Sequence, residues 1–209
     1  MSPETPTQDR IYLAVKRDYL DGRFRPTERV DIKAIADRHL TSPTPVREVL
    51  SRFVGERLFE HRPEGGFRPS LPSADRLADL YALHRDAIAI ALGHADTQHL
   101  RRVLANHRSR VREPDPVSTA HSIASFFASI ADGARNIELH DHVQNLGERL
   151  LLPRIEESRV LDGLEQELKS MMRNGLVDIR NVVGKRVARY HDRRIARSSE
   201  IVEAMAQPA

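Results

Sequence analysis

The chain has 209 residues, of which 40% are hydrophobic and 30% charged, with a formal net charge of +3. This length allows one or two domains, and the composition is that of a folded protein rather than a disordered one. The sequence contains no cysteine, which excludes disulfides, thiolate metal sites and cysteine nucleophiles. No apolar run approaches the roughly 20 residues that span a bilayer, and the polar start lacks the apolar core of a signal peptide. We therefore expect a cytoplasmic protein without membrane contact. Its positive charge is compatible with nucleic acid but is weak evidence alone.

The N-terminal third has the pattern of three helices followed by a hairpin. After a loose tail over residues 1–10, apolar spacing predicts a helix over 11–20, which Asp21-Gly22 ends. Asp31 can cap a second helix that ends near His39. A sharp turn at 41–45 leads into a third helix. Its apolar residues lie on one stripe: Val46, Val49, Leu50, Phe53 and Val54.

Two short strands, 58–61 and 67–70, are predicted around the turn Pro63-Glu64-Gly65-Gly66. The order helix, helix, turn, helix, hairpin is that of a winged helix-turn-helix. In this motif the first helix of the pair supports the second, whose polar face enters the major groove. The sequence therefore predicts a winged helix-turn-helix domain over residues 8–70.

The segment from Ser42 to Leu50, Ser-Pro-Thr-Pro-Val-Arg-Glu-Val-Leu, closely resembles the recognition-helix signature of the GntR family of transcription regulators. The segment 22–29 and the turn Gly65-Gly66-Phe67 resemble the approach and the wing of the same family. The resemblance implies a sequence-specific DNA-binding transcriptional regulator, a repressor, that is not an enzyme and has no cofactor. It also implies which residues face DNA: Lys33, Ser42, Thr44, Arg47, Arg62, Gly65 and Gly66.

These residues differ in what they can recognise. Arg47 can donate two hydrogen bonds to guanine N7 and O6, whereas Ser42 and Thr44 can donate to phosphate. The alternative for Ser42 is that it only caps the helix. Pro43 stands where the family has an arginine; the helix should tolerate it, but a cation is lost, so we do not carry over the family's operator. Arg57 replaces a common glycine, at a cost of about 1 kcal/mol if its backbone is left-handed.

From residue 73 to about 201 the strand signals stop, and six apolar stripes at helical spacing predict an all-α antiparallel helical bundle. The segment from Leu80 to His84, Leu-Tyr-Ala-Leu-His, resembles the opening of the FCD-type effector domain in the FadR-like branch of the family. This resemblance implies a small-molecule effector of the organic-acid class. We also expect a homodimer on a palindromic double-stranded DNA operator, because one recognition helix reads only a few base pairs.

Many FadR-like regulators hold a divalent metal with one aspartate and three histidines. The alignment places Ile123, Phe127, Glu165 and Arg186 at these four positions, so we expect no metal there. Periodicity predicts that all four side chains point inward. Because buried opposite charges are normally paired, we expect Glu165 and Arg186 to face each other or a ligand. The alternative is that one or both lie at a helix end and reach water.

Three histidines share apolar helix faces: His84, His107 and His142. With Glu165 and Arg186 they are the candidate effector-binding residues, as polar groups converging in an apolar cavity. One alternative is that these histidines are core residues bonded to neighbouring backbone. Another is a relocated metal site. Six further histidines fit surface or loop positions: His61, His94, His99, His121, His140 and His191.

Two other functional classes remain. An enzyme lacks support, because the sequence has no phosphate loop, HExxH, GxSxG or dinucleotide-binding turn. The second is a helical ligand-binding or interaction protein with a degenerate DNA-binding domain, which the loss of a cation at Pro43 suggests. Arg47, Lys33 and the glycine wing argue against it.

Overall fold

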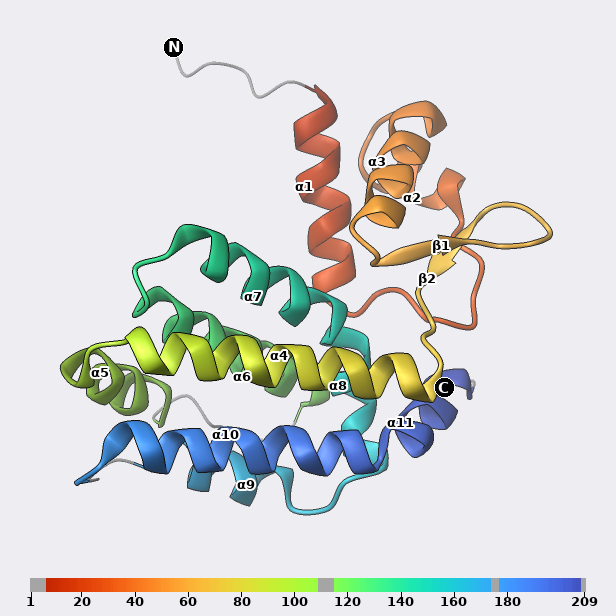
Figure 1. Ribbon diagram of the computed structural model, residues 1–209. Coiled ribbons are helices and arrows are strands. Elements are labelled where there is room, and N and C mark those ends of the chain that lie inside the picture. Colours follow the sequence, from red (N-terminus) through yellow and green to blue (C-terminus); the bar gives the residue numbers. More distant parts are fainter. Residues whose placement is uncertain (1–6, 109–114, 174–176, 208–209) are drawn as a thin grey trace, which may run out of the picture. The chain divides into compact units, whose positions relative to one another are not determined.

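The computed structural model describes residues 7–108, 115–173 and 177–207 (Figure 1). The described residues are mainly helical and include one two-stranded sheet, which confirms the mainly-α fold class. The chain divides into two compact units, residues 1–71 with 205–209 and residues 72–204. Among the helices of the described ranges, none combines the length and the apolar character that a bilayer crossing requires.

The first unit contains three helices and a hairpin in the predicted order: α1 (Thr7–Leu20), α2 (Ile32–Arg38), α3 (Pro43–Gly55), β1 (Phe59–His61) and β2 (Phe67–Pro69). The strands pair antiparallel, with Phe59 opposite Pro69. The expected tail is too long, because α1 already begins at Thr7, and Asp9 in its first turn favours helix there. Residues 1–6 of that tail lie outside the described ranges.

Aromatic side chains form the centre of the first unit. The ring of Phe59 lies 5.2 Å from Phe24 and 5.6 Å from both Tyr19 and Phe53, measured between ring centroids. These residues come from α1, the loop that follows it, α3 and β1, so a single aromatic cluster joins the helices to the hairpin. Aromatic pairs in such tilted and edge-on arrangements add about 0.5–1.5 kcal/mol each beyond their burial.

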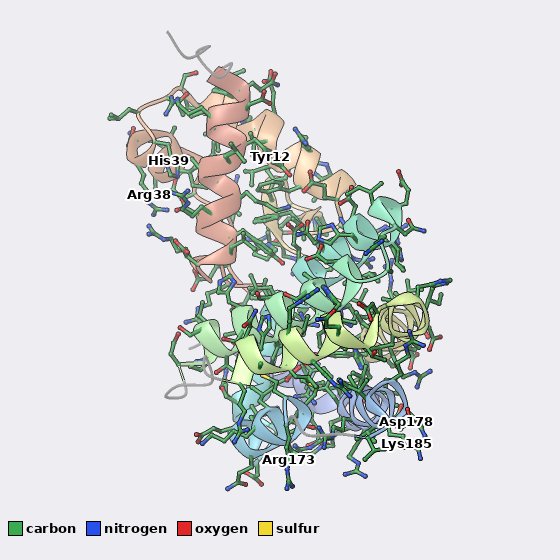
Figure 2. The ribbon with its side chains drawn as sticks, turned by 90° about the vertical axis from the view of Figure 1, so that its left-hand side faces the viewer. Tyr12, Arg38, His39, Arg173, Asp178 and Lys185 are labelled. Carbon is green, nitrogen blue, oxygen red and sulfur yellow. The ribbon has the colours of Figure 1, made fainter. Side chains whose placement is uncertain are left out.

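Two carboxylates fasten α1 to the other helices of this unit. Buried Asp18 accepts hydrogen bonds from Arg38 at 2.9 Å and His39 at 2.8 Å, at the end of α2. Glu56, which follows α3, accepts from the Tyr12 hydroxyl at 2.9 Å. Figure 2 shows Arg38 and His39 on one side of α1 and Tyr12 on the other. Helix α1 therefore holds both helices of the helix-turn-helix.

The second unit contains seven described α-helices and a short 3-10 turn at Glu157–Arg159: α4 (Ala74–His94), α5 (Thr97–Arg108), α6 (Pro116–Asp132), α7 (Ile137–Arg149), α8 (Leu151–Glu156), α9 (Leu164–Met171) and α10 (Ile179–Ala196). An eighth helix, α11 (Ser198–Ala206), begins in this unit and ends two residues past its boundary. The six apolar stripes fall on α4, α5, α6, α7, α9 and α10. The stripe on α5 is expected to run from Leu100 to Val111, and Val111 lies outside the described residues. The sequence analysis does not predict α8, which has only six residues, or α11, which has nine and follows the last of the six stripes.

Helices α4 and α10 run antiparallel along each other (Figure 1). Arg180, near the start of α10, donates to the carbonyl of Ala95 just after α4 at 2.8 and 3.0 Å. Toward the other end of α10, Asp192 accepts from Arg85 of α4 at 2.7 Å. Helix α6 packs against α4, α7 and α8. The inner faces of α4, α6, α8 and α10 thus contribute to one interior.

Candidate DNA-binding surface and buried polar cluster

The first turn of α3 is open to an anion. Ser42 occupies the N-cap position, but its side chain makes no capping hydrogen bond, and the turn contains no acidic residue. The N-terminus of α2 differs, because the carboxylate of Asp31 accepts from the backbone N–H of Ala34 at 3.0 Å. Pro43 and Pro45 have no N–H group, so this turn presents to phosphate the amides of Thr44 and Val46 and the partial positive charge of the helix end. The structure therefore favours the phosphate-contact interpretation of Ser42 over the capping interpretation.

The predicted recognition residues lie on the solvent side of their helices. Thr44 and Arg47 are exposed one turn apart on α3, and Lys33 is exposed on α2. The opposite side of α3 is closed, since Val46 and Leu50 are fully buried. Proline at the first helical position leaves α3 intact, as expected. The fold thus presents Arg47 on a rigidly held helix.

The wing has the predicted glycine turn. Gly65 and Gly66 have φ values of +88° and +89°, in the left-handed region that glycine adopts without strain. A Cβ on Gly66 would lie 2.8 Å from Nε of Arg29. The guanidinium of Arg62 forms an ion pair with Glu64 inside the turn, so its charge is already compensated. Arg29, which the sequence analysis did not select, lies beside the wing instead.

A cleft of about 170 Å³ in this unit is lined by four arginines: Arg23, Arg25, Arg29 and Arg38. Three of them come from the Arg- and Pro-rich connection between α1 and α2. The arginines of this connection are visible in the sequence. The sequence does not show that the connection folds back to lie beside Pro69 of β2. Glu28 and Asp31 also line this cleft, and Asp18 pairs with two of the arginines, so the four arginines do not by themselves form a positive surface.

The candidate effector residues of the second unit separate into different environments. His84 is fully buried. Buried His107 lies 3.1 Å from the Ser129 hydroxyl, which fits the core-histidine alternative, although its partner is a side chain. His142 is exposed, so its expected inward orientation is wrong. Helix α7 buries Val143 and Leu146, and His142 falls outside that stripe.

The expected contact between Glu165 and Arg186 is also wrong. Glu165 is exposed and pairs with Lys169 one turn later. It lies in the first turn of α9, where water reaches it and the helix dipole favours a carboxylate. Arg186 donates to the backbone carbonyl of Arg173 at 2.9 Å. It lines a separate cleft of about 260 Å³ with Arg189 and Arg193.

His191, which the sequence analysis placed at the surface, is fully buried against His84. Its Nδ1 lies 2.7 Å from the carbonyl of Val187, and its Nε2 lies 2.8 Å from Nδ1 of His84. Burial lowers the pKa of His191 to about 3 and the pKa of His84 well below its usual value. Both rings are therefore neutral. The sequence analysis assigned His191 to the surface because arginines stand close to it in the sequence, whereas its side chain lies on the inner face of α10.

The direction of these two hydrogen bonds follows from the neutral rings. A carbonyl can only accept, so Nδ1 of His191 carries the proton and its Nε2 accepts. Nδ1 of His84 must then donate to that Nε2. The remaining nitrogen of His84, Nε2, consequently holds a lone pair and no proton. It is buried and has no hydrogen-bond partner within the described residues.

A fully buried ion pair between Arg194 and Glu157 lies next to the two histidines. Arg194 contacts Glu157 at 2.8 Å, and the hydroxyl of Tyr81 donates to the same carboxylate at 2.6 Å. Glu167 is a second acceptor for Arg194 at 3.0 Å. Burial lowers the pKa of Arg194, but the nearby carboxylates more than offset this and raise it well above its usual value. This arginine is fully compensated.

A second buried arginine, Arg154 of α8, is not compensated. It is 2% exposed, and only its Nη1 finds an acceptor, the carbonyl of Gly147 at 3.4 Å. Within the described part of the chain its Nε and Nη2 have no hydrogen-bond partner, and the same is true of the Tyr190 hydroxyl. Sequence reasoning missed Arg154 because it lies on α8, a helix that the periodicity does not reveal.

These unpartnered groups surround one ring, that of Phe127 on α6. Its centroid lies 4.9 Å from the ring of His84, 5.4 Å from the ring of Tyr190 and 5.7 Å from the guanidinium carbon of Arg154. These three residues come from α4, α8 and α10 and pack around Phe127, the position that the alignment assigns to the family's first histidine ligand. We call His84, Arg154 and Tyr190 the buried polar cluster.

The residues at this position do not fit a divalent metal. Ile123 and Phe127 are buried and cannot ligate, and the guanidinium of Arg154 would repel a cation. Among the residues that the structure describes, no group of three or more His, Cys, Asp or Glu side chains could hold a metal ion. A site relocated to Glu165 and neighbouring histidines is not seen in that part of the chain.

The family model and the curated relative that match this chain cover only a part of it, and the family model lies within the first unit. Residues 7–68 match the family model described as bacterial regulatory proteins, gntR family. The HTH-type transcriptional repressor GlaR of Escherichia coli (strain K12) is 31% identical over 70 residues, which are 34% of this chain. The match spans about a third of that relative's length, 32%.

Solved structures resemble the whole chain. A transcriptional regulator of Rhodococcus sp. RHA1, described as GntR, has a TM-score of 0.76 at 16% identity and covers 93% of this chain and 98% of its own. E. coli McbR/YncC has a TM-score of 0.69 at 17% identity, with 94% and 98% covered. At such low identity these similarities establish the fold of both units and leave the ligands open.

Proposed function

Because this chain belongs to the gntR family of bacterial regulatory proteins through residues 7–68, we propose that it is a sequence-specific DNA-binding transcriptional repressor. It binds a palindromic duplex operator as a homodimer, and a small organic acid in the second unit controls it. The relative GlaR is described as a transcriptional repressor and the Rhodococcus protein as a transcriptional regulator, and we propose no enzymatic activity for this chain.

The observation that carries this proposal is the state of α3. Its N-terminus is uncapped and free of acidic residues, and its exposed side offers Thr44 and Arg47. An arginine at this place can donate two hydrogen bonds to guanine N7 and O6, and the uncapped first turn can bind the neighbouring phosphate. Lys33 on α2 contributes positive charge without base specificity. Retention of all these features argues against a degenerate DNA-binding domain, despite Pro43.

An exposed apolar pair on α4 supports the homodimer. Leu83 and Ile90 are 47% and 55% exposed and lie two turns apart on one side of the helix. Large apolar side chains at such spacing are suited to a symmetric helix-helix contact. The change Ile90→Asp should convert a dimer seen in sedimentation equilibrium into a monomer. A wild-type chain that sediments only as a 23.7 kDa monomer at micromolar concentration would contradict the symmetric mechanism.

The proposed function is tested by selecting bound duplexes from a random pool with the full chain. We expect an enriched sequence with two-fold symmetry, whose half-sites are about one helical turn apart. The control is the variant Arg47→Ala, which should lose the preference for one base pair in each half-site. Failure to enrich any sequence, while binding of bulk DNA persists, would overturn sequence-specific recognition.

A further inference from the structure

We propose that the cleft between α9 and α10 binds the phosphate group of a small phosphomonoester through the guanidinium groups of Arg186, Arg189 and Arg193. The cleft has a volume of about 260 Å³, and its lining residues all belong to the second unit. Neither Ile123 nor Phe127 lines it, so it is distinct from the space around Phe127 where the buried polar cluster packs. The proposal goes beyond the regulatory function and does not rest on it.

The three arginines form a row along α10. Arg186 and Arg189 are three residues apart, and Arg193 follows four residues later, so they lie on one side of the helix in successive turns. Helix α9 adds Glu167 and Ser170 to the lining. A guanidinium offers parallel N–H donors that match two phosphate oxygens, and a serine hydroxyl can donate to a third. The donors of the cleft therefore suit a phosphate group.

The charge of these arginines is not compensated within the cleft. Neither Arg186 nor Arg189 forms an ion pair with a described residue. Glu167, the acidic residue of the lining, lies 3.5 Å from Arg193 and also accepts from Arg194 at 3.0 Å. Three lining arginines against one glutamate leave two positive charges. A phosphomonoester carries about 1.5 to 2 negative charges at pH 7, which matches this excess.

The cleft of the first unit shows what a compensated arginine cluster looks like. Its four arginines share their lining with Glu28 and Asp31, and Asp18 pairs with Arg23 and Arg38. The chain thus supplies carboxylates to one group of arginines and leaves two members of the other group without any. This difference directs the search for an anion to the cleft between α9 and α10.

The surroundings of Arg186 favour an anion there. This arginine donates to the backbone carbonyl of Arg173 at 2.9 Å, which brings two arginines close together. Partial burial and the positive charge of Arg173 lower the pKa of Arg186. The buried Arg194 differs, because nearby carboxylates raise its pKa. A bound phosphate would give Arg186 the negative neighbour that Arg194 already has.

The cleft also has an apolar part, which favours an ester over free phosphate. Met171 and Tyr190 line it and are 2% and 1% exposed. Its volume is close to the lower end of small-molecule sites, which span roughly 300–1,000 Å³. A phosphate on the arginines therefore leaves room for a small organic group beside Met171 and Tyr190.

The test is calorimetric titration of the full chain in phosphate-free buffer of low ionic strength. Phenyl phosphate is the probe, benzoate replaces its phosphate by a carboxylate, and inorganic phosphate lacks the organic group. We expect phenyl phosphate to bind at least tenfold more tightly than either of the others. Equal affinities for phenyl phosphate and benzoate would refute phosphate recognition. Equal affinities for phenyl phosphate and inorganic phosphate would refute the ester, and absence of binding by both would refute the site.

Variants connect the binding to the cleft. Arg186→Gln and Arg189→Gln should each weaken phenyl phosphate binding about tenfold. Arg189 is exposed and has no described partner, so its substitution should leave the fold intact and decides if Arg186→Gln does not fold. The matched controls are Arg29→Gln in the cleft of the first unit and Arg102→Gln on the exposed side of α5; both should bind like the wild type. Wild-type affinity in Arg189→Gln would overturn the assignment.

DNA also carries phosphates, so the titration is repeated with the chain saturated by random duplex DNA. We expect the affinity for phenyl phosphate to stay within twofold. Displacement of phenyl phosphate by DNA, together with weaker DNA binding by Arg189→Gln, would show that the cleft contacts the DNA backbone and would overturn the small-molecule assignment. The proposed function fails separately: if no duplex is enriched but phenyl phosphate binds through Arg189, the site stands and the regulatory function falls.

Discussion

The two buried histidines should make the stability of the chain depend on pH. His191 has a pKa of about 3 in the folded protein, whereas an unfolded histidine titrates near 6.5. Below pH 6.5 the histidine is therefore protonated in the unfolded chain but not in the folded chain. The free energy of unfolding then falls as the pH is lowered from about 6.5 to about 3. At about 1.36 kcal/mol per unit, His191 alone lowers the free energy of unfolding by about 2 kcal/mol between pH 7.5 and 5.0. His84 adds to this loss in the same direction.

Urea unfolding of the full chain, followed by circular dichroism at pH 7.5, 6.5, 5.5 and 5.0, measures this loss. The variant His191→Gln keeps an acceptor for His84 but cannot titrate, so its loss over the same interval should be smaller by about 2 kcal/mol, whatever its absolute stability. His94→Gln, at an exposed position, is the matched control and should follow the wild type. If His191→Gln and the wild type lose stability equally, the reasoning about a neutral buried pair is refuted.

Three further substitutions test the packing by thermal or urea unfolding. Arg57→Gly should stabilise the first unit by about 1 kcal/mol, because φ is +60° at this position; a loss of stability would contradict that backbone. Gly133→Ala should destabilise by about 1–3 kcal/mol, since the new Cβ would lie 2.5 Å from Cδ2 of His99; a neutral effect would show slack packing there. Tyr81→Phe should cost about 1–3 kcal/mol by leaving Glu157 one donor short, and wild-type stability would show that water replaces the hydroxyl.

The first unit could be predicted closely because its signals are local. The apolar stripe of α3 and the paired glycines each specify a structure within a few residues. The confirmed N-cap at Asp31 is equally local. Arg29 was missed for the opposite reason, because its position beside Gly66 depends on how the connection after α1 folds back.

The interior of the second unit was predicted poorly because periodicity ranks positions only by hydrophobicity. Arg154 and His191 are buried polar residues next to other charges, and the pattern assigns such residues to the surface. Glu165 shows the reverse error, since a place in an extended stripe does not ensure burial when the helix begins at Leu164. The six helical stripes themselves were sufficient to predict an all-α bundle.

The central claim, that α3 reads DNA sequence through Arg47, is tested most directly by binding of the selected duplex over a range of salt concentrations. Fluorescence anisotropy compares the wild type with Arg47→Ala and Lys33→Ala. We predict that Arg47→Ala loses about 1–3 kcal/mol on the selected duplex and little on random DNA. Lys33→Ala should weaken both duplexes alike and reduce the salt slope by about one unit. Wild-type affinity and selectivity in Arg47→Ala would contradict the account, because α3 would then not be the recognition helix.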